Sequence, residues 1–228
     1  MHFIIPGILL LIVIYGPALW ARYTFKRYNK PSPHFPGTGA ELARHLLNRF
    51  DLPHVKVEIT KIGDHYDPES KTVCLSPQYF EAKSLSAITI AAHEVGHAIQ
   101  DAQNHPMLEL RSRLVKIAMT AEKLGSIAII AIPIITALTR APSAGILLFI
   151  VAIGSMLVST LVHLVTLPVE WDASFGKAMP VLKAGEYISE NEQKAAKKIL
   201  RAAALTYVAS SLVSLLNVGR WIAVLWRR

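Results

Sequence analysis

Cysteine is almost absent from this 228-residue chain, which contains only Cys74. A single cysteine cannot form an internal disulfide, and it argues against a structural zinc site, since such sites are usually closed by four ligands rich in cysteine. Cys74 lies in the apolar run TVCLS, where we expect a buried strand residue. Glycines are scattered and nothing resembles a phosphate-binding loop. The sequence therefore gives no sign of a disulfide framework or of a nucleotide site.

Charged residues are also scarce, at 18% of the chain, whereas hydrophobic residues make up 52%. This balance is typical of a membrane protein rather than a cytosolic one. The net charge of +8 could indicate nucleic-acid binding. However, the lysines and arginines lie beside apolar segments and not in basic patches interleaved with aromatic residues. We therefore expect the lipid bilayer, and no nucleic acid, as a partner of the basic residues.

The first apolar stretch, residues 3–20, is long enough to span a membrane and contains no charged residue. Four basic residues follow it between positions 22 and 30. A secretory signal peptide has its basic residues before the apolar core, so this charge order argues against one. We interpret the stretch as an uncleaved anchor with its N-terminus outside and the following residues in the cytoplasm.

Three further apolar stretches are candidates for membrane helices. Residues 117–139 and 143–167 both meet the length requirement, and only the short segment RAPS separates them, which predicts a tight hairpin. Residues 202–218 form a shorter run followed by three arginines, which a fourth crossing would place outside, against the charge rule. The sequence therefore predicts three to four transmembrane helices.

Residues 22–116 have a mixed composition and are long enough for a small water-facing domain. Thr38 and Glu41 have the spacing of a capping box, which predicts a helix starting there. The segments 55–59 and 71–75 read as strands with a turn, DPES, before the second, which predicts a hairpin. The strand at 71–75 is also a candidate edge for an extended substrate.

An apolar helix is predicted from about residue 84 to residue 104, and two histidines and a glutamate interrupt it. His93, Glu94 and His97 form the pattern H-E-x-x-H, and residues four apart lie on one helix face, so both imidazoles can reach one ion. Zinc with three protein ligands keeps one position for water and lowers the pKa of that water to about 7. Glu94 can take the proton and pass it to the leaving amine. The pattern predicts a zinc peptidase.

A third zinc ligand must come from elsewhere in the chain. The metzincin pattern fails, because Gln100 and Gln103 occupy its glycine and third-histidine positions. The candidates are His105, His163 and Glu170. His105 follows the predicted helix end, and His163 lies inside a predicted span, where an ionisable residue suggests a function. Glu170 follows that span, the predicted hairpin returns it to the side of the water-facing part, and it would complete a thermolysin-type His, His, Glu set.

Five stretches of the chain, TGAELAR, DHYDP, AAHEVGHAIQ, TLPVEWDAS and AALTYVASSLVSLL, resemble the YugP-like family of neutral membrane zinc metallopeptidases, a bacterial group. The matching region extends from about residue 20 to residue 218. This resemblance implies that His93, His97 and Glu170 are ligands of one Zn²⁺ ion and that Glu94 is the catalytic base.

The segment after Glu170 also resembles the E-x-x-A-D signature of membrane gluzincins, in which the aspartate supports a zinc-binding histidine. Ser174 occupies the aspartate position here, and Asp172 lies two residues earlier. Either residue is a candidate for the supporting role. Metal-binding histidines usually donate their second N–H to a carboxylate or a carbonyl, which favours Asp172 on chemical grounds.

The polar cluster GDHYDP, residues 63–68, has two interpretations. His65 or Tyr66 could donate a hydrogen bond to the oxyanion that develops during acyl transfer. Alternatively, Asp67 and Pro68 form a turn and Tyr66 packs in the core. The sequence leaves both interpretations open.

We therefore predict a mainly α membrane protein with three to four transmembrane helices and a small α+β zincin-like catalytic insert. We expect it to be a multi-pass protein of the bacterial cell membrane that cuts peptides or membrane proteins at the cytoplasmic surface. The predicted parts are an anchor at 1–21, a water-facing part with the H-E-x-x-H helix at 22–116, a transmembrane hairpin at 117–168, a third-ligand segment and helix at 169–201, and an apolar helix, expected in the membrane, at 202–228.

Two alternatives remain. One is an intramembrane protease of the site-2 type, because the H-E-x-x-H helix is itself apolar. Charged residues at positions 81, 83 and 101 bracket that helix closely, which favours a site at the membrane surface. The other is a non-catalytic scaffold held together by metal, against which the scarcity of cysteine argues.

Overall fold

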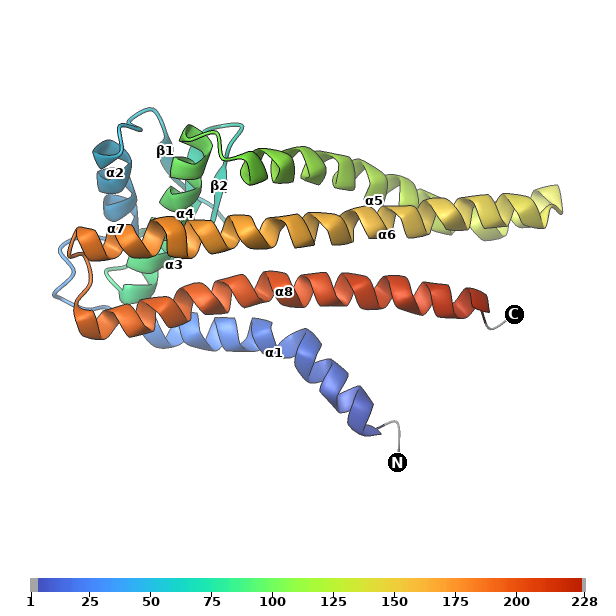
Figure 1. The fold of residues 1–228 in the computed structure, drawn as a ribbon, viewed down its shortest axis with the longest axis horizontal. Coiled ribbons are helices and arrows are strands. Elements are labelled where there is room, and N and C mark those ends of the chain that lie inside the picture. Colours follow the sequence, from blue (N-terminus) through green and yellow to red (C-terminus); the bar gives the residue numbers. More distant parts are fainter. Residues whose placement is uncertain (1–3, 227–228) are drawn as a thin grey trace. The chain divides into compact units, whose positions relative to one another are not determined.

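The structure is a computed structural model that describes residues 4–226, with side chains outside 4–10, 13–14, 142, 212 and 214–226. Helices dominate and the strands are few (Figure 1), which confirms a mainly α chain with a small α+β part. The elements in chain order are α1 (Ile4–Tyr28), α2 (Gly39–Arg49), β1 (Lys56–Ile59), β2 (His65–Asp67), β3 (Thr72–Leu75), α3 (Pro77–Phe80), α4 (Leu85–Ala102), α5 (Pro106–Thr139), α6 (Pro142–Trp171), the π-helix η1 (Asp172–Ala178), α7 (Met179–Ala184) and α8 (Glu190–Trp226).

The chain divides into two compact units. The first unit comprises Met1–Leu108 and Pro168–Thr206, and the second comprises Glu109–Leu167 and Tyr207–Arg228. The chain therefore leaves the first unit near the start of α5 and returns to it near the end of α6. The H-E-x-x-H helix and Glu170 both belong to the first unit, although the intervening segment Glu109–Leu167 does not.

The sheet has three strands in the order β1-β3-β2. β3 pairs in parallel with β1 and antiparallel with β2, so the predicted hairpin between 55–59 and 71–75 is wrong. The DPES turn instead joins β2 to β3; the three-residue β2 was too short to show strand periodicity. The suggestion that 71–75 offers an edge is also wrong, because β3 is central and is hydrogen-bonded on both sides. Cys74 is only partly buried there, contrary to expectation.

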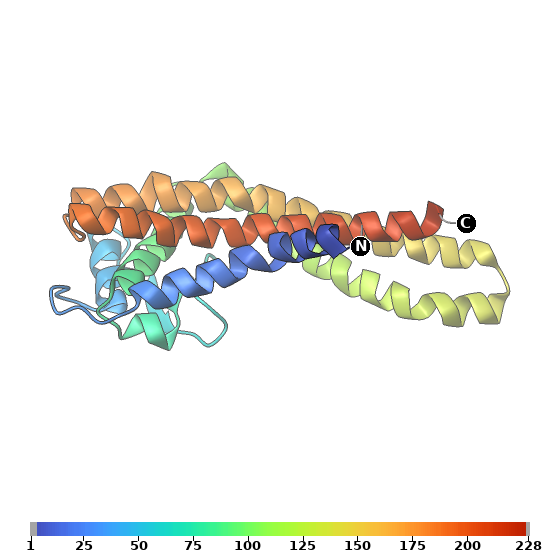
Figure 2. The ribbon, with the colours of Figure 1, turned by 90° about the horizontal axis from the view of Figure 1, so that it is seen from below.

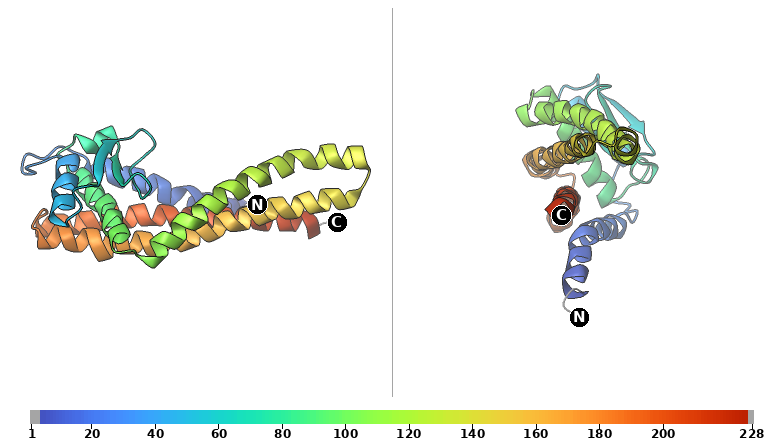
Figure 3. Two further views of the ribbon diagram at one scale, coloured as in Figure 1. Left: turned by 90° about the horizontal axis from the view of Figure 1, so that it is seen from above. Right: turned by 90° about the vertical axis from the view of Figure 1, so that its right-hand side faces the viewer.

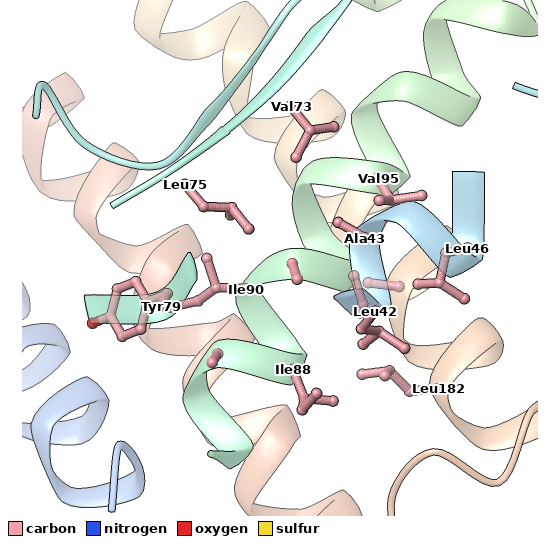
Figure 4. Packing of buried hydrophobic residues seen from close by; sticks show 14 of the residues in the cluster. Leu42, Ala43, Leu46, Val73, Leu75, Tyr79, Ile88, Ile90, Val95 and Leu182 are labelled. Atoms are coloured by element: carbon pink, nitrogen blue, oxygen red, sulfur yellow. The ribbon is translucent and has the colours of Figure 1, made fainter. Parts of the chain in front are cut away.

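Helix α2 begins with the predicted capping box. Thr38 Oγ1 accepts from the Glu41 N–H at 3.2 Å, and Glu41 Oε2 accepts from the Thr38 N–H at 2.7 Å. These two bonds satisfy N–H groups that the first helical turn leaves without a partner. Figure 4 shows Leu42 and Leu46 of α2 packing toward α4, so the cap fixes where this apolar face meets the central helix.

Helix α4 is the centre of the first unit. It contacts α2, the sheet, η1 and α7, and Figure 1 shows it between α2 and β2. Ser84 Oγ caps it by accepting from the Ala87 N–H at 3.2 Å, which agrees with the predicted start of the helix at about residue 84. All residues from Leu85 to Gln100 are buried, and the helix ends at Ala102, two residues before the expected end. The apolar run around H-E-x-x-H is therefore core packing.

The segment after η1 completes the core. α7 contributes Leu182, and the start of α8 contributes Ile199 and Leu200, all of them buried in the same cluster as α2 and α4. Between α7 and α8 the chain reverses direction in a short turn (Figure 2). Ser189 and Glu192 form a second capping box there, with the Ser189 N–H donating to Glu192 Oε2 at 2.9 Å.

The second unit contains a helical hairpin in which α5 and α6 are joined by a short turn (Figure 3). Among the described residues, two helical stretches are long and apolar enough to cross a membrane: Pro106–Thr139, which is α5, and Ser143–Ala184, which runs from α6 through η1 and α7. In the most apolar 18 residues of each stretch, only 11% of the residues are buried. Of the other two predicted spans, residues 4–20 belong to α1 and residues 202–218 belong to α8, whereas residue 3 lies outside the described residues. Both spans include residues whose side chains lie outside the described part. The total of three to four spans stays a prediction.

Candidate metal centre

Helix α4 places the two histidines of the motif side by side. His93 and His97 are one turn apart, their ring centroids are 4.8 Å apart, and their planes are nearly perpendicular. Both residues are buried, and so is Glu94. Buried imidazoles require polar partners, and several partners of these two rings come from a distant segment of the chain.

Glu170 is that distant partner. Its Oε2 lies 3.1 Å from His93 Nε2 and 3.5 Å from His97 Nε2, and only 1% of the residue is exposed. One ligand atom from each of the three residues lies within 4.8 Å of the others. In a tetrahedral zinc site with bonds of about 2.0–2.1 Å, ligand atoms are about 3.3 Å apart. The donor set and its spacing therefore fit one zinc ion.

The other third-ligand candidates lie elsewhere. His105 Nε2 is 3.8 Å from Asp172 Oδ2, and His105 is not part of the cluster formed by the histidines of α4. His163 belongs to the part of α6 that lies in the second unit. Of the three candidates, the structure brings Glu170 to the two histidines.

Each histidine has a second polar partner on its Nδ1 atom. Ser174 Oγ lies 3.2 Å from His93 Nδ1, and Gln100 Oε1 lies 2.9 Å from His97 Nδ1. Asp172 contacts neither ring in these hydrogen bonds; its Oδ2 accepts from Gln100 Nε2 at 2.8 Å. Both sequence candidates for the supporting role therefore lie at the site: Ser174 contacts the His93 ring directly, and Asp172 is linked to the His97 ring by hydrogen bonds through Gln100. Gln100 was missed, although its position three residues after His97 indicated the same helix face.

Close packing between α4 and η1 brings these groups together. A Cβ at Gly96 would lie 2.8 Å from the Ala173 carbonyl oxygen, so only glycine lets η1 approach α4 at this distance. A Cβ at Gly176 would lie 2.1 Å from Asp172 Oδ1, so the carboxylate occupies space that a side chain at 176 would fill. π-Helical turns inside helices are frequent at functional sites, and η1 begins two residues after Glu170.

Glu94, the candidate base, is only 5% exposed and lies beside His93 on α4. Glu94 also affects Cys74 on β3. Burial raises the pKa of the Cys74 thiol, and the negative charges of Glu58, Asp67 and Glu94 raise that pKa further. The Cys74 thiol is thus kept protonated near neutral pH, so it is a poor metal ligand and a poor nucleophile.

The polar cluster of β2 has a structural connection to α4. The Tyr66 hydroxyl donates to Asp101 Oδ2 at 2.6 Å, and the Lys71 ammonium donates to the same oxygen at 2.6 Å. Burial and the Asp101 carboxylate raise the pKa of Tyr66, so it remains a donor. His65 Nδ1 lies 2.8 Å from the Gly63 carbonyl oxygen, to which it can donate. Tyr66 therefore joins the sheet to the turn of α4 that follows His97.

A cavity of about 1390 Å³ lies elsewhere in the first unit, lined in part by Leu42, Ile88 and Tyr187. None of the residues of the candidate metal centre lines it. An ion pair between His34 and Glu192, with an Nε2–Oε1 distance of 2.8 Å, forms part of its wall. The cavity is therefore separate from the candidate metal centre. The buried cluster, and not the cavity, has the two imidazoles and the carboxylate that a zinc ion requires.

Comparison with known proteins identifies the class. The chain belongs to the family described as "Putative neutral zinc metallopeptidase", whose profile matches residues 3–226. It is 34% identical over 223 residues, covering 95% of each chain, to the "Putative membrane protease YugP" of Bacillus subtilis (strain 168). No solved structure gives a significant match. The resemblance inferred from the sequence motifs is confirmed: the protein is a membrane-associated zinc metallopeptidase, a hydrolase whose buried His93, His97 and Glu170 could bind the ion.

Proposed function

We propose that the protein is a zinc-dependent endopeptidase in which His93, His97 and Glu170 hold one zinc ion and Glu94 is the general base. The observation that carries this proposal is the convergence of three ligand atoms within 4.8 Å in a buried site. When bound with three protein ligands, zinc activates a water molecule and polarises the scissile carbonyl.

The residues of the chain have separate roles in this proposal. Glu94 lies beside the ligands on α4, where it can accept the proton from the attacking water and pass it to the leaving amine. Ser174 supports the His93 ring, and Gln100 with Asp172 supports the His97 ring. His65 remains a candidate oxyanion donor. Tyr66 is a weaker one, because its hydroxyl would have to leave Asp101.

We further propose that the protein is a multi-pass protein of the bacterial cell membrane with its site on the cytoplasmic surface. Residues 1–21 would be an anchor, 117–168 a transmembrane hairpin and 202–228 an apolar membrane helix. The parts at 22–116 and 169–201 would be zincin-like and water-facing. Support comes from the basic residues at 22–30, which follow the charge rule. Peptides or membrane proteins would be the substrates.

Two observations weigh against the alternatives. An intramembrane site would lie inside a bundle of membrane-spanning helices, yet α4 packs against α2 and the small sheet. Helix α4 is also not one of the two helices among the described residues that are long and apolar enough to cross a membrane. A closed structural zinc site would require a fourth protein ligand, and the cluster of candidate ligands among the described residues contains three. A site with three ligands and one open position is the catalytic type.

The test is a Glu94→Gln variant in detergent or in vesicles. We expect cleavage of an unstructured reporter such as casein to fall by about 10²–10⁴-fold, because the base is lost. Zinc content should stay at about one ion per chain, because the amide does not disturb the ligands. Glu58→Gln, a change on an exposed residue of β1, is the matched control and should cleave like the wild type.

Unchanged turnover in Glu94→Gln would rule out the base assignment. Loss of zinc together with activity would show instead that Glu94 supports the metal. Running the same assay on a peptide embedded in the bilayer separates the alternatives, since a surface enzyme should leave that peptide intact.

A further inference from the structure

Gln100 connects the two segments that supply the metal ligands. Its side chain is completely buried. Its Oε1 lies 2.9 Å from His97 Nδ1, while its Nε2 donates to the Val169 carbonyl oxygen at 2.9 Å and to Asp172 Oδ2 at 2.8 Å. Val169 directly precedes Glu170, so one amide side chain binds a histidine ligand and the backbone next to the glutamate ligand.

The partners of Gln100 fix which way its amide points. A carbonyl oxygen and a carboxylate oxygen can only accept hydrogen bonds, so the NH₂ end must face Val169 and Asp172. The amide oxygen must then face His97, and His97 Nδ1 must carry a hydrogen and donate it. In the neutral ring the Nε2 lone pair is therefore left for a metal, on the side where Glu170 lies.

His93 is held differently. Its Nδ1 partner is the Ser174 hydroxyl, at 3.2 Å. A hydroxyl can donate or accept, so Ser174 permits either tautomer of the ring. The tautomer of His97 is therefore fixed, because each hydrogen bond from His97 through Gln100 to Asp172 can have only one direction. The tautomer of His93 is not fixed in this way.

The far end of this hydrogen-bonded chain lies in η1. Gly176 leaves room for the Asp172 carboxylate, because a Cβ at 176 would lie 2.1 Å from Asp172 Oδ1. The other oxygen, Oδ2, accepts from Gln100 and lies 3.8 Å from His105 Nε2. The chain of hydrogen bonds from Asp172 through Gln100 to His97 therefore links η1 to α4.

We propose that Gln100 is a positioning residue that assembles the metal centre: it holds His97 with Nε2 directed at the ion and holds the Glu170 segment against α4. This inference rests on the ligand set of the proposed function. Gln100 touches neither the metal nor the substrate in this role. Its contribution should therefore appear in metal affinity and coordination geometry.

The first variant is Gln100→Leu, which keeps a similar volume and removes both hydrogen-bonding ends. We expect zinc affinity, measured by competition with a chelator, to fall by about 10–100-fold. The visible absorption spectrum of the cobalt-substituted protein should change, because the His97 ring is no longer held. The matched control is Gln103→Leu, the same substitution on the exposed residue that caps α4, and it should match the wild type in both measurements.

The second variant combines Gln100→Glu with Asp172→Asn. The glutamate keeps an acceptor for His97 Nδ1, and the asparagine supplies the donor that the glutamine lost, so the hydrogen bond between positions 100 and 172 runs in the opposite direction. The Val169 carbonyl oxygen loses its donor, so this variant restores the support of His97 and not the hydrogen bond to Val169. We expect a cobalt spectrum like that of the wild type and a zinc affinity between those of Gln100→Leu and the wild type. A residue that only fills space predicts no such rescue, because the change places a charge in a buried position.

Wild-type affinity and an unchanged cobalt spectrum in Gln100→Leu would overturn the inference. If Gln100→Leu cannot be purified, the cobalt spectrum of the double variant decides: the wild-type spectrum supports the inference, and an altered spectrum overturns it. His97→Ala separates this outcome from failure of the proposed function. Retention of zinc by His97→Ala would contradict the ligand set itself, whereas normal zinc binding by both Gln100 variants would remove only the role of Gln100.

Discussion

Helices α4 and α6 are both rich in apolar residues but have opposite surroundings. Every residue of α4 from Leu85 to Gln100 is buried by other parts of the protein. In the apolar window of the helix Ser143–Ala184, only 11% of the residues are buried. A similar apolar composition therefore occurs in two surroundings. Helix α4 packs in a protein core, whereas most residues of the apolar part of α6 are not buried by the protein, as is expected of a helix that crosses a membrane.

Polar side chains on the two helices differ in the same way. In α6, the hydroxyls of Ser155, Thr160 and Thr166 donate to carbonyl oxygens three or four residues earlier in their own helix. In α4, His93 and Gln100 bond to residues about 70 to 80 positions away. A polar group that bonds within its own helix needs no partner segment, whereas His93 and Gln100 require one. Their partners are Glu170 at the end of α6 and Asp172 in η1, so the candidate site lies where α4 meets these two segments.

The largest difference in stability between the two helices is expected when an isoleucine in each is replaced by alanine. Ile88 of α4 is 3% exposed and Ile150 of α6 is 61% exposed. We expect Ile88→Ala to lower the free energy of unfolding by about 2–5 kcal/mol, because it leaves a cavity in the core. Ile150→Ala should cost less than about 1 kcal/mol. Thermal unfolding of both variants in the same detergent measures the two losses of stability. Equal losses would contradict the proposed difference between α4 and α6.

A smaller difference between the two helices is expected when a glycine in each is replaced by alanine. A methyl group at Gly96 of α4 would lie 2.8 Å from the Ala173 carbonyl oxygen, whereas nothing lies within 4 Å of the Cβ position at Gly154 of α6. We expect Gly96→Ala to cost about 1–3 kcal/mol and to weaken zinc binding, because it separates η1 from α4. Gly154→Ala should be neutral or stabilise by up to about 1 kcal/mol. Unaltered zinc affinity in Gly96→Ala would show that the metal centre does not require the close packing of η1 against α4.

The smallest expected effect concerns the connection from the sheet to α4. Tyr66→Phe removes the hydrogen bond to Asp101 and should cost about 1 kcal/mol at neutral pH. Because the pKa of Tyr66 is raised, the folded protein keeps this proton above about pH 10 while the unfolded chain releases it. Stability should therefore fall as pH rises above about 10, and fall less steeply in the variant.

Part of that alkaline dependence should survive the substitution, because burial also raises the pKa of Tyr79 to about 12. The variant and the wild type can be compared by thermal unfolding between pH 8 and pH 11. Identical slopes would show that Tyr66 does not contribute through its proton.

Local signals in the sequence predicted α2, α4 and the two histidines, because a capping box and an i, i+4 pair depend only on neighbouring residues. The order of the strands could not be predicted, since β2 has three residues and its pairing with β3 is a tertiary contact. Spacing alone left His105, His163 and Glu170 open as the third ligand. Gln100 was missed because its partners, Val169 and Asp172, lie about 70 residues away.

The central claim is that a glutamate from the end of α6 completes a metal site begun on α4. Zinc content of purified wild type, Glu170→Ala and His105→Ala tests it most directly, with circular dichroism confirming that each variant is folded. We expect about one zinc ion per chain in the wild type and in His105→Ala, and a large loss in Glu170→Ala. Full zinc occupancy in a folded Glu170→Ala protein, or its loss in His105→Ala alone, would contradict the claim.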